Sequence, residues 1–183
     1  MKYKTPSTSR LGASPLVRKF ASKIADAAGG APILDVACGS GRNAMLLSDL
    51  GCTVVCIDRD LTRLKIELGS RPSRVTSSRL QLCHLDLAND PWPFDGGSVG
   101  GVINVHFLLP ALFPLFEKSL MLGGYLLLES VPGCGGNYVE LPAAGQVRTA
   151  LGKAFDFEFY KESKVGPPGF DAVTVKVVAK RCL

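Results

Sequence analysis

The hydrophobic pattern of this chain changes between helical spacing and short strand-like runs. Residues 15–28 place apolar side chains at helical spacing, with Ser14 as a capping residue and Pro15 at the first helical position. Gly29 and Gly30 follow and end that helix. The later apolar runs predict five strands, at residues 31–37, 53–57, 79–85, 99–105 and 124–130. Further helical patterns occupy residues 43–50, 60–68, 110–121 and 143–153.

Strands that alternate with helices predict an α/β fold with a parallel sheet and right-handed crossovers. Two last strand-like runs, residues 155–160 and 172–179, face each other across the turn at residues 166–169 and predict an antiparallel hairpin. A length of 183 residues fits one folding unit. We therefore expect a flexible head at residues 1–14 and a single domain at residues 15–183.

Composition and charge narrow the class of protein. The net charge of +5 is spread along the chain, so it does not favour nucleic acid as a partner, although nucleic acid stays an alternative. The six cysteines form no C-x-x-C pair and there are only two histidines, so we expect no metal site. Reduced thiols, a head without a signal-peptide pattern and no apolar run long enough to span a membrane predict a cytoplasmic protein.

A glycine turn follows the first predicted strand. Gly39-Ser40-Gly41 stands between that strand and the helix at residues 43–50, an arrangement that brings backbone N–H groups and a helix N-terminus to a ligand. Glycine is needed where a Cβ would block the approach. The hexad from Gly39 to Ala44 also fits the dinucleotide pattern G-x-G-x-x-G/A, so the turn alone does not separate NAD from other nucleosides.

Acidic residues end the next two predicted strands. Asp58 lies seventeen residues beyond Gly41, where a carboxylate could accept hydrogen bonds from both ribose hydroxyls, and Asp86 ends the third strand. In an open parallel sheet the carboxyl ends of the strands border the ligand crevice, and Asp35 lies on the same side. The alternative is that these aspartates cap the turns or helices that follow them.

The segment from Ile33 to Ala44, which reads Ile-Leu-Asp-Val-Ala-Cys-Gly-Ser-Gly-Arg-Asn-Ala, resembles the first motif of class I S-adenosylmethionine-dependent methyltransferases. It is most similar to the small bacterial branch that includes the tellurite-resistance methyltransferases, whose turn also reads Cys-Gly-x-Gly-Arg-Asn. The likeness continues through residues 51–58 and, more loosely, through residues 122–129, and it covers about residues 15–180.

This resemblance implies a Rossmann-like three-layer sandwich around a seven-stranded, mostly parallel sheet of order 3-2-1-4-5-7-6, with a C-terminal antiparallel hairpin. S-adenosylmethionine, with S-adenosylhomocysteine as its product, would lie across the ends of the first three strands. Gly39 and Gly41 would face the methionine part, Asp58 the ribose and Asp86 with Leu87 the adenine. The complete expected cofactor set is Asp35, Cys38, Gly39, Ser40, Gly41, Arg42, Asn43, Asp58, Arg59, Asp86, Leu87 and Asn104.

Two residues are candidates for the reaction itself. His106 follows the fourth strand and could serve as a base or orient a substrate, although a histidine bonded only to the backbone is an open alternative. Tyr138 belongs to a glycine-rich loop at residues 132–141 that could act as a lid. The sequence Asn-Val-His-Phe at residues 104–107 departs from the Asn-Pro-Pro-Tyr pattern of enzymes that methylate amide or adenine nitrogens.

Short connections leave no room for a separate substrate domain, so a small or exposed acceptor is favoured, with its accepting atom open. An NAD(P)-dependent oxidoreductase and a cofactor-binding module without turnover are the competing interpretations. Asp35 and Cys38 around the first strand, and the glycine pair before the fifth, favour methyl transfer over NAD chemistry. The sequence does not indicate an oligomeric state.

Overall fold

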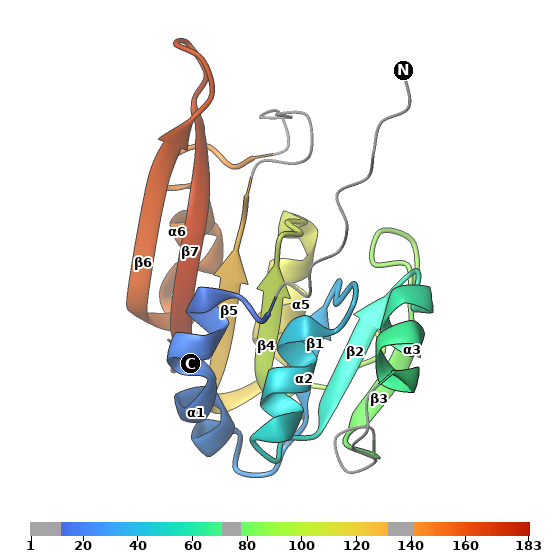
Figure 1. Ribbon diagram of the computed structural model, residues 1–183. Helices are drawn as coiled ribbons and strands as arrows, with labels where there is room; N and C mark the ends of the chain where they lie inside the picture. The colour runs from blue at the N-terminus through green and yellow to red at the C-terminus, as the bar shows by residue number, and fades with distance from the viewer. Residues whose placement is uncertain (1–11, 71–77, 132–140) are drawn as a thin grey trace, which may run out of the picture.

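The computed structural model describes residues 12–70, 78–131 and 141–183. Within these ranges, seven strands form one sheet in the order β3-β2-β1-β4-β5-β7-β6 (Figure 1). Neighbouring strands from β3 to β5 are parallel, and β7 runs antiparallel to both β5 and β6. This confirms the predicted fold and strand order. The strands are β1 (Ile33–Val36), β2 (Val54–Asp58), β3 (Leu80–His84), β4 (Val99–Val105), β5 (Leu120–Glu129), β6 (Phe155–Val165) and β7 (Ala172–Arg181).

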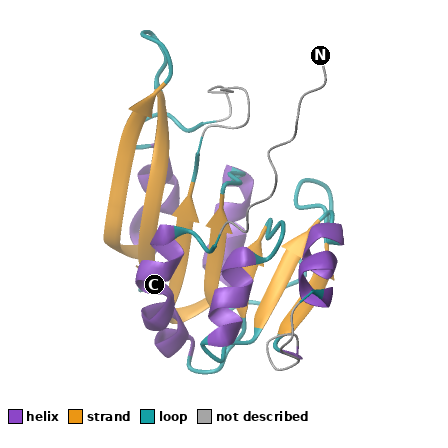
Figure 2. Ribbon diagram, viewed as in Figure 1, coloured by secondary structure: helices purple, strands orange, loops and turns teal. Residues whose placement is uncertain are grey.

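Helices cover both faces of the sheet (Figures 1 and 2). One face packs against α1 (Pro15–Ala28), α2 (Arg42–Asp49) and α3 (Thr62–Gly69). The other packs against α5 (Phe113–Ser119) and α6 (Gln146–Leu151). Single 3₁₀ turns, η1 (Pro110–Leu112) and η3 (Gly152–Ala154), precede α5 and follow α6. The longest described helix, α1, has 14 residues, and no described helix has the length and apolar character of a membrane span.

The first helix begins and ends where the sequence predicts. The Ser14 hydroxyl oxygen accepts a hydrogen bond from the Leu16 N–H at 3.1 Å, so it caps the helix, and Pro15 occupies the first turn. Gly29 follows the last turn with a φ of 56°, the left-handed conformation that glycine adopts at little cost. Local sequence therefore fixes both ends of α1.

Several predicted elements have different bounds, and strand pairing explains two of the differences. The helix predicted at residues 110–121 begins as η1 and ends at Ser119, because Leu120 already pairs with Val99 and starts β5. The strand predicted at residues 155–160 continues to Val165, because its polar second half pairs with β7 as far as Ala172. In both cases pairing with a neighbouring strand outweighs the local pattern.

A buried carboxylate lies in the central strand β1. Asp35 is 1% exposed, and its Oδ2 accepts a hydrogen bond from the Ala44 N–H at 3.0 Å, in the first turn of α2. Burial raises the pKa of this carboxyl to about 7, although the Ala44 N–H opposes the shift. Asp35 thus connects β1 to α2 at the cost of burying an ionisable group.

We predict that Gly100→Ala destabilises the fold. A Cβ at Gly100 in β4 would lie 2.6 Å from the Cα of Ala28 in α1, so helix and sheet would have to separate. We expect the free energy of unfolding, measured by urea denaturation, to fall by about 1–3 kcal/mol. Gly69→Ala is the matched control, because, apart from its chain neighbours and its own helix backbone, no described atom lies within 4 Å of a Cβ at this last residue of α3. An equal loss in both variants would contradict the close approach of α1 to β4.

A second prediction concerns pH. Folding raises the pKa of Asp35 to about 7, so between about pH 4 and about pH 7 this carboxyl is ionised in the unfolded chain but still protonated in the folded one. The free energy of unfolding therefore falls as the pH rises over that interval. Asp35→Asn removes this loss and can keep the bond from the Ala44 N–H. Relative to the wild type, the variant should gain about 2–4 kcal/mol in unfolding free energy between about pH 4 and about pH 8. The measurement is urea denaturation of both proteins across this pH range. If the difference in unfolding free energy between variant and wild type does not change with pH, the pKa of Asp35 is not raised by folding.

Candidate functional site

A cavity of about 450 Å³ lies at the carboxyl ends of β1, β2, β3 and β4. Its volume falls in the range of small-molecule sites. Its walls come from the turn after β1, the end of β2 and the segments that follow β3 and β4. The lining residues are Ala37, Cys38, Gly39, Ser40, Arg42, Asn43, Asp58, Arg59, Leu85, Asp86, Leu87, Ala88, Val105, His106 and Phe107.

The backbone turns sharply where the two central strands reach this cavity. Ala37 follows β1 with a φ of 55°, and His106 follows β4 with a φ of 67°. Among the described residues, these are the two non-glycine residues with positive φ. Left-handed backbone is unfavourable for residues with a Cβ and tends to occur at functional sites. Here both residues line the cavity.

The two glycines of the turn have different surroundings. Gly39 has a φ of 55°, and, its chain neighbours aside, no described atom lies within 4 Å of a Cβ built there, so this residue leaves open space at the cavity wall. A Cβ at Gly41, where φ is 73°, would lie 2.4 Å from Leu64 Cδ1 in α3. The left-handed backbone favours glycine at both positions, but only Gly39 lines the cavity, whereas Gly41 faces the end of the Leu64 side chain.

Asp58 is the last residue of β2, and backbone donors hold both of its carboxylate oxygens. Oδ2 accepts a hydrogen bond from the Gly39 N–H at 2.8 Å, and Oδ1 accepts one from the Asp60 N–H at 3.0 Å. Each oxygen can still accept a second bond. Asp58 thus presents a carboxylate of fixed orientation to the cavity.

The turn after β3 carries Asp86 and Leu87, and both line the cavity. The Asp86 carboxylate accepts hydrogen bonds from Asn89 Nδ2 at 2.9 Å and from the Ala88 N–H at 3.0 Å. These two bonds, led by that from Asn89, hold its pKa below the usual value of an aspartate. Asp86 therefore caps the turn that follows it, as the alternative in the sequence analysis had it. It also borders the cavity.

Some expected site residues do not line the cavity. Asp35 is covered by α2, as described above. Asn104 in β4 is 1% exposed, and its Nδ2 donates a hydrogen bond to the Val36 carbonyl oxygen at 3.2 Å. Its Oδ1 is a buried acceptor without a hydrogen-bond partner among the described residues. Tyr138 lies outside the described residues.

Cys38 lines the cavity and contacts a second cysteine. A hydrogen bond between the Cys38 and Cys56 side chains, together with burial, raises the pKa of the Cys38 thiol. The thiol is therefore protonated at neutral pH and a poor nucleophile. In the described part of the chain, no group of three or more His, Cys, Asp or Glu side chains is placed to hold a metal ion.

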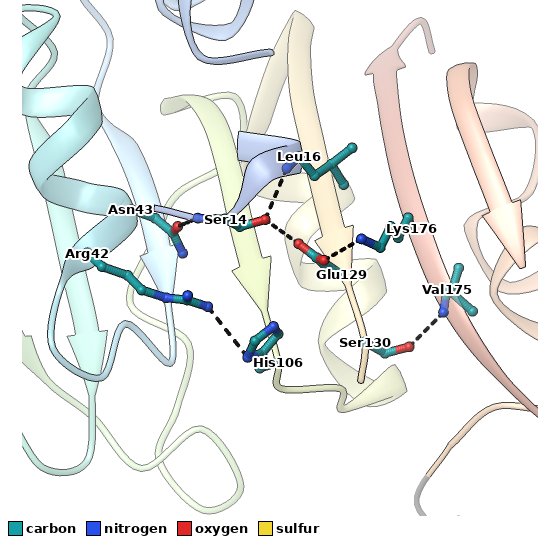
Figure 3. A network of polar contacts seen from close by, with 9 residues as sticks. All are labelled: Ser14, Leu16, Arg42, Asn43, His106, Glu129, Ser130, Val175 and Lys176. Carbon is teal, nitrogen blue, oxygen red and sulfur yellow. Dashed lines mark hydrogen bonds and ion pairs between the residues drawn. The ribbon is translucent and has the colours of Figure 1, made fainter. Parts of the chain in front are cut away.

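A polar network that the sequence analysis missed lies beside the cavity (Figure 3). The Ser14 N–H donates to Asn43 Oδ1 at 3.0 Å, and the Ser14 hydroxyl donates to the carboxylate of Glu129 at the end of β5. Lys176 in β7 pairs with the same carboxylate at 2.8 Å. Burial would raise the pKa of Glu129, but the bonds from Lys176 and Ser14 outweigh it and lower that pKa. The end of β5 thus carries a buried, ionised carboxylate.

Arg42 and His106 meet at the cavity wall (Figure 3). One guanidinium nitrogen of Arg42 lies 3.5 Å from His106 Nδ1, and the other terminal nitrogen lies 3.4 Å from the Gly12 carbonyl oxygen. The His106 N–H donates to the Glu129 carbonyl oxygen at 2.7 Å. Loss of solvent around the ring and the charge of Arg42 lower the pKa of His106. The imidazole is therefore neutral at neutral pH.

No protein-family model and no curated protein matches this chain. Solved structures do match it in fold. The [4+2]-cyclase SpnF superposes with a TM-score of 0.68 at 15% identity over 97% of this chain and 85% of SpnF. TehB from Haemophilus influenzae gives 0.65 at 17% identity, over 87% of this chain and 62% of TehB. The glycopeptide N-methyltransferase MtfA gives 0.62 at 20% identity over 97% of this chain and all of MtfA.

These structures can be compared with the resemblance to S-adenosylmethionine-dependent methyltransferases that the sequence suggested. TehB is a tellurite-resistance methyltransferase, and S-adenosylmethionine-dependent methyltransferases recur among the other matches. At these identities the likeness concerns the fold. The chain has the Rossmann-like fold of S-adenosylmethionine-dependent methyltransferases.

Proposed function

We propose that this protein is an S-adenosylmethionine-dependent methyltransferase that acts on a small or exposed acceptor. The observation that carries the proposal is the hydrogen bond from the Gly39 N–H to Asp58, which places an open glycine turn and a fixed carboxylate on one wall of the cavity. Matches to structures bound to S-adenosylmethionine and to S-adenosylhomocysteine support it through the fold.

The residues present fit this cofactor. The free oxygen lone pairs of Asp58 suit the two ribose hydroxyls, and the open space at Gly39 suits the methionine part. Asp86 and Leu87 would border the adenine. Cys38, Ser40, Arg42, Asn43 and Arg59 complete the wall, while Asp35, Gly41 and Asn104 would act by holding that wall in place.

When bound, S-adenosylmethionine would supply a methyl group activated on a sulfonium. The protein then has to align the acceptor with that methyl and exclude water. His106 and Phe107 line the end of the cavity at β4 and would contact the acceptor. Tyr138 stays a candidate for the same role, and a cytoplasmic location and a single domain at residues 15–183 remain predictions.

The class of ligand is tested by isothermal titration of the purified protein with S-adenosylhomocysteine, S-adenosylmethionine and NAD(P) side by side, after a check for ligand retained from the host. We expect saturable binding of both adenosyl ligands and none of NAD(P). Binding of NAD(P) alone would select the oxidoreductase that the G-x-G-x-x-A pattern also allows. Adenosyl binding without transfer to any of a panel of acceptors would select a module without turnover.

The role of Asp58 is tested by Asp58→Asn. The amide cannot replace a charged acceptor for two hydroxyls, so affinity for S-adenosylhomocysteine should fall by about 1–3 kcal/mol, or about 5- to 150-fold, in the same titration. Asp156→Asn, at an exposed position in β6, is the matched control and should bind as the wild type does. Unchanged affinity in a folded Asp58→Asn protein would place the ribose elsewhere.

A further inference from the structure

The position of His106 is fixed by its backbone. It follows the last residue of β4 in a left-handed conformation, with a φ of 67°, and its N–H is bonded to the Glu129 carbonyl oxygen at 2.7 Å. The ring lies at the cavity wall beside Arg42 (Figure 3). Because both strands that set this geometry are inner strands of the sheet, the backbone of His106 holds a fixed place at the rim of the cavity.

The contact with Arg42 determines which ring nitrogen carries the proton. A guanidinium offers only donors, and it lies 3.5 Å from His106 Nδ1, so a hydrogen bond between the two requires a lone pair on this nitrogen. A neutral imidazole then carries its proton on Nε2. Among the described residues, none is hydrogen-bonded to Nε2, so this N–H is free to meet a ligand.

The charges around the ring favour the neutral form. Loss of solvent lowers the pKa of His106, and the charges of Arg42 of α2 and Lys176 of β7 act in the same direction. Glu129 of β5 opposes them, but its carboxylate is bonded to Lys176 and Ser14. Arg42 has no carboxylate partner among the described ion pairs, so its positive charge remains available at the cavity.

We propose that His106 donates a hydrogen bond through Nε2–H to a methyl acceptor that is already an oxyanion, such as a carboxylate, and that it does not act as a general base. A base needs an unoccupied lone pair, whereas the lone pair on Nδ1 faces Arg42 and Nε2 holds the proton. The Nε2–H offers a donor to the anionic group, and the positive charge of Arg42, on the other side of the ring, attracts that group electrostatically. This inference rests on the proposed methyl transfer.

The chemistry of such an acceptor balances without a base. A carboxylate oxygen forms the new O–C bond to the methyl carbon while the C–S bond of the sulfonium breaks. The electron pair of that bond stays on sulfur, so an ester and a neutral thioether result, and no proton moves. A neutral alcohol would have to lose a proton, and His106 in this tautomer cannot take it.

The tautomer can be observed directly by long-range proton–nitrogen NMR of the imidazole rings. The chain has only two histidines, so His84→Gln assigns the signals of His106. We expect a protonated Nε2 and a bare Nδ1 at neutral pH. Arg42→Met should mix the two tautomers and raise the pKa of His106. The matched control Arg59→Met, at the other arginine of the cavity wall, should leave the tautomer unchanged. A proton on Nδ1 in the wild type would overturn the proposal.

A second experiment tests the anionic acceptor, with S-adenosylhomocysteine saturating so that the carboxylate of the cofactor is already in place. Benzoate should shift the His106 ring signals saturably, and neutral benzamide should not. Equal shifts from the two probes, or none from benzoate, would refute an oxyanion at Nε2. The tautomer measurement needs no cofactor, so failure of S-adenosylhomocysteine to bind would refute the proposed function while the tautomer result still stands.

Discussion

The geometry of the cavity depends on one hydrogen bond, from the Gly39 N–H to the Asp58 carboxylate at 2.8 Å. This bond connects the turn after β1 to the end of β2. One residue earlier in each segment, the Cys38 N–H donates a backbone hydrogen bond to the Ile57 carbonyl oxygen at 3.0 Å. The turn must therefore bend back at Ala37, the residue with left-handed backbone. Because α2 begins directly after this turn, the orientation of Arg42 depends on the same bond.

A second set of bonds joins elements that are distant in the sequence. Glu129 at the end of β5 holds Ser14 before α1 and Lys176 in β7, and the Ser14 N–H is bonded to Asn43 in α2. Each of these partners comes from a different element, so the network holds the start of α1 beside the cavity wall. The Glu129 side chain is 5% exposed, and a buried charge of this kind is stable only while its partners remain in place.

The sequence predicts those parts of the structure that depend on local patterns. The Ser14 cap, the glycine turn and the position of Asp58 at the end of β2 follow from short motifs, and the alternation of strands and helices yields the parallel sheet. The position of the Leu64 side chain where a Cβ at Gly41 would lie, and the pairing of Glu129 with Lys176, could not be predicted, because they depend on how helices pack and on the register of a distant hairpin. The same limit explains why β5 begins earlier than its apolar run suggests.

Fold alone does not fix the reaction, since a [4+2]-cyclase shares this architecture. The distribution of charge in the cavity is more specific. Asp58 and Asp86 lie at the ends of β2 and β3, whereas Arg42 and His106 lie beside the ends of β1 and β4. A ligand with hydroxyl donors at one end and a negative charge at the other is favoured in one orientation, because the reverse orientation would place its anion against two carboxylates that Arg59 offsets only in part. In the proposed function this polarity would order nucleoside and acceptor along the sheet edge, with the acceptor at the end where Arg42 lies beside His106.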